Sequence, residues 1–135
     1  PDTPVISISG DGGMQMNIQE LATAVLEELP IISCVFNNNN LGMVRQWQDL
    51  FYEERYSATV LRDAVDFVKL AEAMGARGIR ATTREEFDAA LEQALAADGP
   101  VVLDCIIDSD DKVWPMVAPG APISEAFSEE DMKNS

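Results

Sequence analysis

Apolar residues in the chain occur partly as continuous runs and partly at helical spacing, and each pattern predicts a different element. Runs that are mostly apolar and rich in β-branched residues cover residues 5–9, 31–36 and 101–107, and a shorter stretch, Gly-Ile-Arg-Ala, covers 78–81. These runs predict four strands. The three longer runs are typical of strands that are buried in a sheet.

Between these runs, apolar residues repeat at the spacing of a helix face. The segments with this spacing are 17–28, 43–52, 67–74 and 87–95. Three of them have a polar residue suited to N-capping at or near their start, namely Asn17, Asp66 and Thr83. Glu20 and Glu86 follow Asn17 and Thr83 by three residues, as in a capping box. The pattern therefore predicts four helices, three of them with capped N-termini.

Strands that alternate with helices predict an α/β fold, a parallel sheet with helices on both faces. Four strands are few for such a sheet, and the chain opens on a strand without an initiator methionine. We therefore expect an N-terminally truncated domain, with further strands upstream of Pro1. Residues 1–127 would form the C-terminal part of that domain, and the acidic residues 128–135 would form a mobile tail.

The composition narrows the classes of function. The chain has 135 residues, with 24 Asp and Glu against 9 Lys and Arg, a net charge of −15 and no His. This charge would repel a polyanion, which argues against a nucleic-acid partner. The absence of His excludes Ser-His-Asp and Cys-His catalysis and any His-ligated metal within the chain. Apolar residues, at 47%, are numerous enough for a buried core.

The two cysteines, Cys34 and Cys105, lie inside apolar runs. This placement favours two buried, reduced thiols in an intracellular protein over a disulfide. No apolar stretch reaches the length that spans a bilayer, so we expect no membrane partner.

Polar residues gather directly after the first two predicted strands. Residues 10–13, Gly-Asp-Gly-Gly, follow the first strand, and four asparagines at 37–40 follow the second. A strand–helix–strand unit makes these strands parallel, so both clusters are expected at one edge of the sheet. Open α/β sheets bind their ligands at that edge.

Asp11 and the asparagine oxygens form a set of hard oxygen ligands that suits Mg²⁺. The glycines would let backbone amides approach a phosphate, and a helix beginning near Asn17 would add its positive end. The alternative is purely structural, because Gly-Asp-Gly alone is an ordinary tight turn and an asparagine run an ordinary solvated loop. The agreement between the two clusters favours a metal–diphosphate site.

The spacing of these clusters resembles a known motif. Gly10-Asp11-Gly12, 24 further residues and then Asn37-Asn38 are similar to the thiamine diphosphate-binding motif of thiamine-dependent enzymes. The chain from about residue 3 to 127 also resembles acetolactate synthases (acetohydroxyacid synthases). The segments that carry this likeness are 11–21, 41–48, 51–52, 66–71, 99–102 and 114–120. Residues 43–47, Met-Val-Arg-Gln-Trp, are the most family-specific and resemble the biosynthetic, flavin-containing branch more than the catabolic one.

The resemblance implies a metal site and a cofactor site. Asp11, the Asn38 side chain and the Asn40 carbonyl would ligate Mg²⁺. The residues that would bind thiamine diphosphate are Gly10, Asp11, Gly12, Gly13, Asn38, Gly42 and Met43. The Gly12 and Gly13 amides would contact the diphosphate. Family members commonly have Ser where Gly13 stands, so no hydroxyl contact is implied there.

Trp47 would line the substrate channel by the same resemblance. A structural alternative stands beside this one. Met43 and Trp47 are four residues apart on one helical face, a spacing that more often reflects core packing.

The activity implied is condensation of two pyruvate molecules, or of pyruvate and 2-ketobutyrate, with loss of CO₂ in branched-chain amino-acid biosynthesis. The cofactor would carry the chemistry, and the family's activating glutamate belongs to a domain that this chain does not match. No catalytic residue is therefore assigned here, and the chain alone is expected to be inactive. FAD, a homodimer or tetramer and a regulatory small subunit would belong to the parent enzyme. Its location would be cytoplasmic in a bacterium or archaeon and organellar in a eukaryote.

Two other functions remain open at this stage. Another thiamine-dependent 2-ketoacid decarboxylase or carboligase would share Asp11 and Asn38 but should lack the stretch from Met43 to Trp47. A non-catalytic α/β module that binds a partner or an anion would need neither cluster for chemistry.

Overall fold

A four-stranded parallel sheet forms the centre of the computed structural model, which describes residues 3–62 and 65–133. The predicted start at residues 1–2 and the last two residues of the predicted tail lie outside this description. The strands are β1 (Val5–Gly10), β2 (Ile31–Asn37), β3 (Arg77–Ala81) and β4 (Val101–Ile106), in the order β1-β2-β4-β3. All three pairings are parallel, as the sequence predicts.

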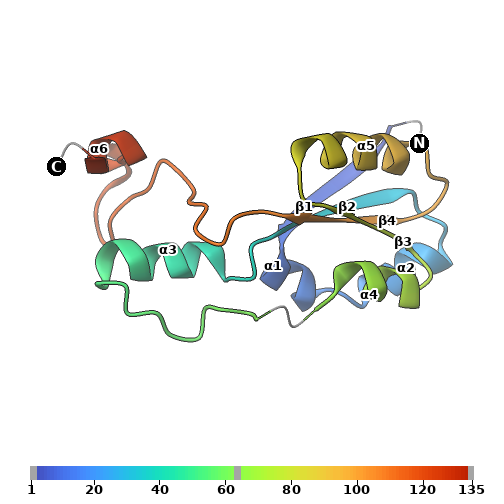
Figure 1. Ribbon diagram of the computed structural model, residues 1–135, viewed down its shortest axis with the longest axis horizontal. Helices are drawn as coiled ribbons and strands as arrows, with labels where there is room; N and C mark the ends of the chain where they lie inside the picture. Colours follow the sequence, from blue (N-terminus) through green and yellow to red (C-terminus); the bar gives the residue numbers. More distant parts are fainter. Residues whose placement is uncertain (1–2, 63–64, 134–135) are drawn as a thin grey trace.

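Helices cover both faces of the sheet, so the predicted α/β fold is confirmed (Figure 1). One face carries α1 (Asp11–Met16), α2 (Glu20–Leu26) and α4 (Phe67–Ala73). The opposite face carries α5 (Arg84–Leu95). Each layer encloses its own apolar core, with Val35, Phe67 and Val102 on the first side and Leu103 and Ala90 on the second.

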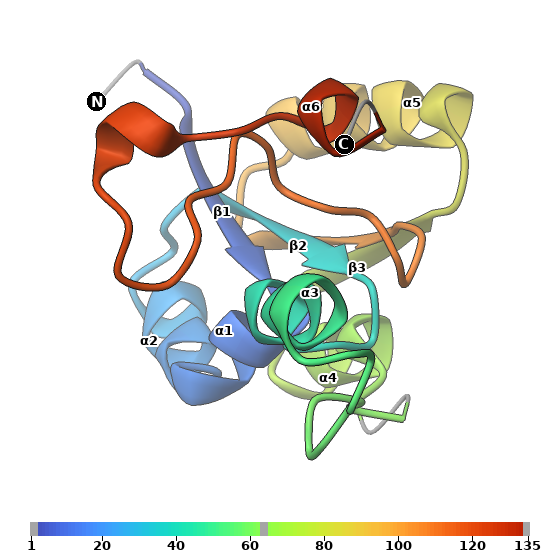
Figure 2. The same ribbon diagram turned by 90° about the vertical axis from the view of Figure 1, so that its left-hand side faces the viewer.

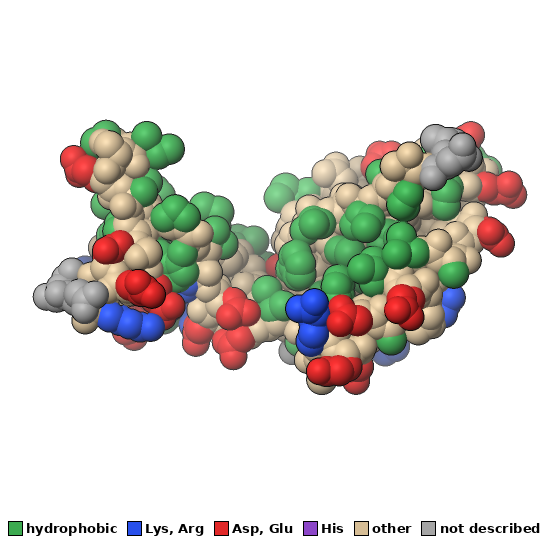
Figure 3. Space-filling view, turned by 90° about the horizontal axis from the view of Figure 1, so that it is seen from above, with side chains coloured by type: hydrophobic (Ala, Val, Ile, Leu, Met, Phe, Trp, Pro, Cys, Tyr) green, Lys and Arg blue, Asp and Glu red, His purple; other side chains and the backbone are tan. Residues whose placement is uncertain are grey.

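Strand β1 differs from its prediction as a buried strand. It lies at the edge of the sheet, and Val5, Ile6 and Ile8 are 54%, 44% and 67% exposed. The physical reason is position, since an edge strand has one neighbour and α5 packs over β3 and β4 rather than over β1. Ile6 and Ile8 lie on the α5 side of the sheet, and Val5 lies on the opposite side near Met14 and Leu21. Figure 3 shows apolar side chains gathered on the part of the molecule that carries the sheet and α5.

The helix starts test the capping predictions. Asp66 caps α4 by accepting a hydrogen bond from Lys69 N at 3.3 Å. Thr83 caps α5 through Glu86 N at 3.2 Å, so both of these predictions are confirmed. The predicted Asn17 cap is wrong, because α2 begins at Glu20 after Gln19 with no side-chain cap.

An unpredicted helix, α1, precedes that start. It begins at Asp11 immediately after β1, where the sequence predicts only a glycine-rich loop. Two glycines in one short turn of helix lower the helix propensity enough to hide it from the pattern.

The helix α3 (Gly42–Phe51) extends away from the sheet and confirms the helix predicted at 43–52 (Figure 1). The C-terminal segment lies beside it and contains the short helices η1 (Ile123–Glu125) and α6 (Glu129–Lys133) (Figure 2). The Phe51 and Phe127 rings meet edge to face at 6.3 Å, which joins α3 to this segment. The predicted mobility of the tail stays a prediction, with α6 lying inside it.

Within the described ranges, no helix is long and apolar enough to cross a membrane. Cys34 and Cys105 are buried and unbridged, as predicted.

Candidate functional site

The carboxyl ends of β1 and β2 bring the two polar clusters together. Gly10 is the register partner of Phe36, so the chain leaves the two strands at the same level. Asp11 then opens α1, and Asn38 to Asn40 form the turn after β2. The adjacency expected from a parallel pair of strands is therefore present.

Asp11 places a buried carboxyl group at this edge. Its side chain is only 3% exposed, and Oδ1 accepts a hydrogen bond of 2.7 Å from Gly12 N. The other oxygen, Oδ2, is buried and has no hydrogen-bond partner among the described residues. Burial raises the pKa of Asp11, against a smaller lowering by the backbone amides of Gly12, Asn39 and Asn40. A buried carboxylate with one unpartnered oxygen is the arrangement that a bound cation would stabilise.

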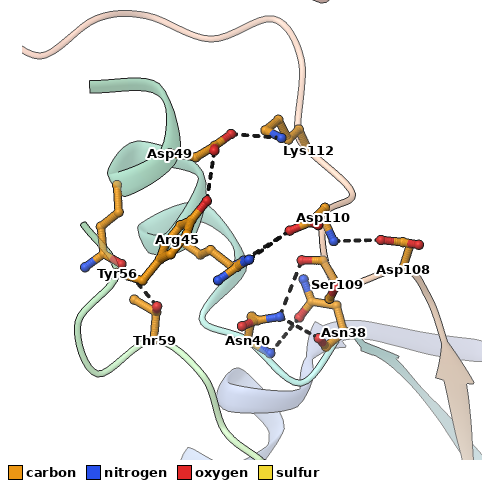
Figure 4. A network of polar contacts seen from close by, with 11 residues as sticks. Asn38, Asn40, Arg45, Asp49, Tyr56, Thr59, Asp108, Ser109, Asp110 and Lys112 are labelled. Atoms are coloured by element: carbon orange, nitrogen blue, oxygen red, sulfur yellow. Dashed lines mark hydrogen bonds and ion pairs between the residues drawn. The ribbon is translucent and has the colours of Figure 1, made fainter. Parts of the chain in front are cut away.

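The turn from Asn38 to Asn40 is held by its own side chains. Asn38 Oδ1 accepts a hydrogen bond of 3.1 Å from Asn40 N, and Asn40 Nδ2 donates to the Asn38 carbonyl at 2.8 Å (Figure 4). Asn40 Nδ2 also reaches the carbonyl of Ser109, at 3.4 Å. The remaining side-chain oxygen of Asn40 is buried and, among the described residues, has no hydrogen-bond partner.

This arrangement fits a hard divalent cation. Asp11 and Asn40 each present a buried, unpartnered side-chain oxygen, whereas the Asn38 oxygen is engaged within the turn. Carboxylate and amide oxygens are the ligands that Mg²⁺ prefers. The described residues contain no cluster of three or more Asp, Glu, Cys or His side chains that could hold a metal ion. The buried oxygen of the Asn40 side chain was not predictable from the sequence, because four asparagines in a row are equivalent until the turn distinguishes them.

Three glycines, Gly12, Gly13 and Gly42, lie at the same edge of the sheet, and the space beside them differs. A Cβ on Gly42 would lie 3.1 Å from Asn38 Nδ2, so Gly42 lets the start of α3 approach the asparagine turn. A Cβ on Gly12 would lie 2.6 Å from Leu41 Cδ2, whereas one on Gly13 would make an ordinary contact of 3.8 Å with Ser9 Cβ. Gly12 and Gly13 stand in the first turn of α1, where backbone N–H groups lack backbone acceptors within the helix, and the Gly12 N–H donates to the Asp11 side chain.

Helix α3 presents its predicted functional residues to the surface. Met43 is 57% exposed and Trp47 is 37% exposed, so neither is buried in a core. Trp47 packs edge to face on Phe51 at 6.0 Å and lines a shallow cavity of about 370 Å³ with Val44 and Tyr52. Its role in a substrate channel remains a prediction, but simple core packing does not describe this side of α3.

The other side of α3 is attached to the segment after β4, a feature that sequence reasoning missed. Arg45 pairs with Asp110 at 3.0 Å, and Lys112 pairs with Asp49 at 2.9 Å (Figure 4). Gln46, the one fully buried residue of α3, also bonds to this segment. Opposite charges separated by more than 60 residues in the sequence give no local pattern from which they could be predicted.

The buried carboxylate of Asp104 is hydrogen-bonded to Arg80 and Asn37. Asp104 is fully buried in β4, and Arg80 on the neighbouring strand donates from Nε to Oδ2 at 2.9 Å. Asn37 Nδ2 donates to Oδ1 at 2.9 Å. The hydrogen bond from Arg80 to Asp104 is the largest of the causes that raise the pKa of Arg80. The sequence indicated that Asp104 needed a partner but could not identify it.

Comparison with known proteins agrees with this geometry. Residues 1–105 match the model of a family described as "Thiamine pyrophosphate enzyme, C-terminal TPP binding domain". The chain belongs to this family. The match contains the two polar clusters, α1 to α5, β1 to β3 and all of β4 except its last residue. The family's fold and the edge described above therefore lie in the same part of the chain.

Within this thiamine pyrophosphate-binding family, the chain is similar to acetolactate synthases. It is 48% identical over 125 residues to the acetolactate synthase isozyme 2 large subunit of Escherichia coli (strain K12). It is 51% identical over 130 residues to an acetolactate synthase of Mycobacterium bovis. Each alignment covers 93% of this chain but only 23% and 21% of the respective relative, so the chain spans less than a quarter of their length.

A solved structure confirms the fold independently. The thiamine diphosphate-dependent 4-hydroxybenzoylformate decarboxylase of Rhodococcus jostii RHA1 superposes with a TM-score of 0.75 at 31% sequence identity. The superposition covers 84% of this chain and 21% of that one. The parallel sheet with helices on both faces is therefore the fold of a thiamine diphosphate enzyme.

Proposed function

We propose that the edge formed by Asp11 and the asparagine turn binds Mg²⁺ together with the diphosphate of thiamine diphosphate. The observation that carries this proposal is the buried Oδ2 of Asp11, which has no hydrogen-bond partner among the described residues and lies beside the turn. A cation at this position would compensate the burial of the carboxylate. Since the first 44 residues contain no Lys or Arg, a diphosphate there needs the cation and backbone amides for charge balance.

The chain's own residues would divide the work of binding. Asp11 and the asparagine turn would hold the metal, with either the Asn38 side chain and the Asn40 carbonyl or the unpartnered Asn40 side chain as the neutral ligands. The amides of Gly12 and Gly13, at the start of α1, would donate to the diphosphate. When bound, thiamine diphosphate would supply the carbanion chemistry that no side chain of this sequence provides.

We further propose that the whole protein is an acetolactate synthase. It would condense two molecules of pyruvate, or pyruvate with 2-ketobutyrate, and release CO₂ in the synthesis of isoleucine and valine. Identities of 48% and 51% over nearly the whole chain support this assignment. FAD, assembly as a dimer or tetramer, a regulatory small subunit and the cellular location expected above belong to this proposal. Gly42 and Met43 would then lie near the aminopyrimidine ring of the cofactor, and Trp47 would line the substrate channel.

A decarboxylase function is the second candidate, supported by the likeness to the 4-hydroxybenzoylformate decarboxylase. The lower identity to that enzyme, 31%, makes it the weaker choice. The two candidates share the same metal and cofactor site and differ in the fate of the decarboxylated substrate.

Calorimetric titration of the protein at its natural length with Mg²⁺ and thiamine diphosphate tests the site. Binding should require both, and Asp11→Ala should abolish it. Asp98→Ala, an exposed carboxylate between α5 and β4, is the matched control and should bind normally. Undiminished binding by Asp11→Ala would refute the site. Acetolactate formed from pyruvate would support the synthase, and release of free aldehyde alone would support the decarboxylase. The 135-residue chain by itself should make neither product.

A further inference from the structure

The buried ion pair in the sheet points towards the asparagine turn. Asp104 stands on β4 between two strands, opposite Val35 of β2 and opposite Arg80 of β3 in the register. It is fully buried on the face of the sheet that α4 covers, among residues that are otherwise apolar. A carboxylate in that position costs free energy unless hydrogen bonds satisfy it, and Arg80 and Asn37 provide them.

Asn37 uses both ends of its side-chain amide. Its Nδ2 donates to Asp104 Oδ1 at 2.9 Å, and its Oδ1 accepts from Asn39 N at 3.2 Å. Asn37 is the last residue of β2 and is 6% exposed. One buried amide therefore connects a carboxylate within the sheet to the backbone of the turn that follows.

The direction of the Asn37 amide is fixed by Asp104. A carboxylate accepts hydrogen bonds only, so the NH₂ group of Asn37 must face it and the oxygen must face the turn. Arg80 forms an ion pair with Asp104 at 2.9 Å. The same nitrogen of Arg80 also pairs with Asp66, the N-cap of α4, at 2.9 Å. Arg80 is thus anchored from two sides.

We propose that Asp104 is a positioning residue for the metal-binding turn, and that it acts through Asn37 on the backbone at Asn39. By orienting the Asn37 amide, Asp104 sets the path of the turn between Asn38 and Asn40, and so places the oxygens that would meet Mg²⁺ next to Asp11. This inference rests on the proposed magnesium site. It adds to that site two residues, Asp104 and Arg80, that touch neither metal nor cofactor.

A role confined to holding β3 against β4 is the competing explanation for the ion pair. The two explanations differ at Asn37, which a purely structural ion pair would not need. An exchange of the two side chains separates them. Asn37→Asp alone sets two carboxylates against each other, whereas Asn37→Asp with Asp104→Asn restores one donor and one acceptor. In the double variant, the new amide at position 104 can donate to position 37 and accept from Arg80.

The experiment uses the protein at its natural length and two readouts. Backbone hydrogen exchange over residues 38–41, measured without ligand, reports the turn directly. Exchange there should be at least about tenfold faster in Asn37→Asp and return to within about threefold of wild type in the double variant. The dissociation constant for Mg²⁺, measured with thiamine diphosphate present, should rise about tenfold in the charge-neutral variant Asn37→Ala.

Asp66→Asn is the matched control. It removes the other ion pair of Arg80 but keeps a side chain that caps α4 equally well. Both readouts should stay within about twofold of wild type. Unchanged exchange over 38–41 in Asn37→Asp, or no recovery in the double variant, would overturn the inference. Absence of Mg²⁺ and cofactor binding in the wild type would instead refute the proposed function, and the exchange measurement would still decide the role of Asp104.

Discussion

Gln46 and Val113 exchange two hydrogen bonds, as neighbouring strand residues would. Gln46 Nε2 donates to the Val113 carbonyl at 2.9 Å, and Val113 N donates to Gln46 Oε1 at 2.9 Å. Gln46 is 3% exposed although it belongs to a helix that otherwise lies at the surface. A side-chain amide thus replaces a strand partner and ties the C-terminal segment to α3, and the Trp47 side of the same helix stays exposed.

Replacing Gln46 by alanine should release the C-terminal segment. Gln46→Ala removes both hydrogen bonds and should lower the free energy of unfolding by about 1–2 kcal/mol. Limited proteolysis should then cut residues 113–127 faster than in the wild type. Gln93→Ala, an exposed glutamine on α5, is the control and should leave the cleavage rate unchanged. Equal cleavage of Gln46→Ala and wild type would show that the aromatic contacts alone hold the segment.

Replacing Asp11 by asparagine should change how the stability of the protein depends on pH. Burial raises the folded-state pKa of Asp11 above its usual value, so its ionisation disfavours the folded state, and stability falls as the pH rises through that pKa. Asp11→Asn, which has no ionisable group there, should therefore flatten the dependence of the free energy of unfolding on pH in the absence of Mg²⁺. Chemical denaturation between pH 4 and pH 8 measures this dependence. An equal loss of stability with rising pH in the wild type and in Asp11→Asn would contradict this account of the carboxylate.

Mg²⁺ should stabilise the wild type but not Asp11→Asn. In the wild type the ion would stabilise the ionised Asp11, so the midpoint of thermal unfolding should rise with Mg²⁺ and thiamine diphosphate. Asp11→Asn should show no such rise. Equal stabilisation of both proteins would place the cation elsewhere.

The sheet was predictable because its information is local. Continuous apolar runs and the caps at Asp66 and Thr83 specify elements within a few residues, and parallel pairing then brings Asp11 to the asparagine turn. The burial of β1 was not predictable in this way. Whether an apolar strand is central or at an edge depends on its neighbours rather than on its own composition.

In the candidate site too, the residues at strand ends were predictable, whereas the contacts between residues far apart in the sequence were not. Asp11 and the asparagine turn follow directly from strand ends, and the sequence locates them. The links from Asn37 to Asp104 and from Gln46 to Val113 each join residues 67 positions apart. Polar pairs of that kind have no periodicity, so the sequence indicates at most that a buried carboxylate such as Asp104 requires a partner.

The buried thiols should resist modification in the folded protein. Burial raises the pKa of Cys105 to about 11 and also raises that of Cys34. Because only the thiolate reacts with iodoacetamide, about one Cys105 thiol in a thousand is reactive at pH 8 even before access is considered. Alkylation measured by mass spectrometry should therefore follow the unfolding curve in urea. Rapid labelling without denaturant would contradict the burial of both side chains.

The glycines at the sheet edge should tolerate substitution unequally. A Cβ on Gly13 makes an ordinary contact with Ser9, so Gly13→Ser should fold normally and should not weaken cofactor binding. A Cβ on Gly42 would press on Asn38 Nδ2 at 3.1 Å and displace the turn that would hold Mg²⁺. Gly42→Ala should therefore weaken Mg²⁺-dependent binding of thiamine diphosphate about tenfold while the melting temperature changes little. Titration calorimetry on the two variants measures the difference, and equal affinities would mean that the start of α3 does not set the position of the asparagine turn.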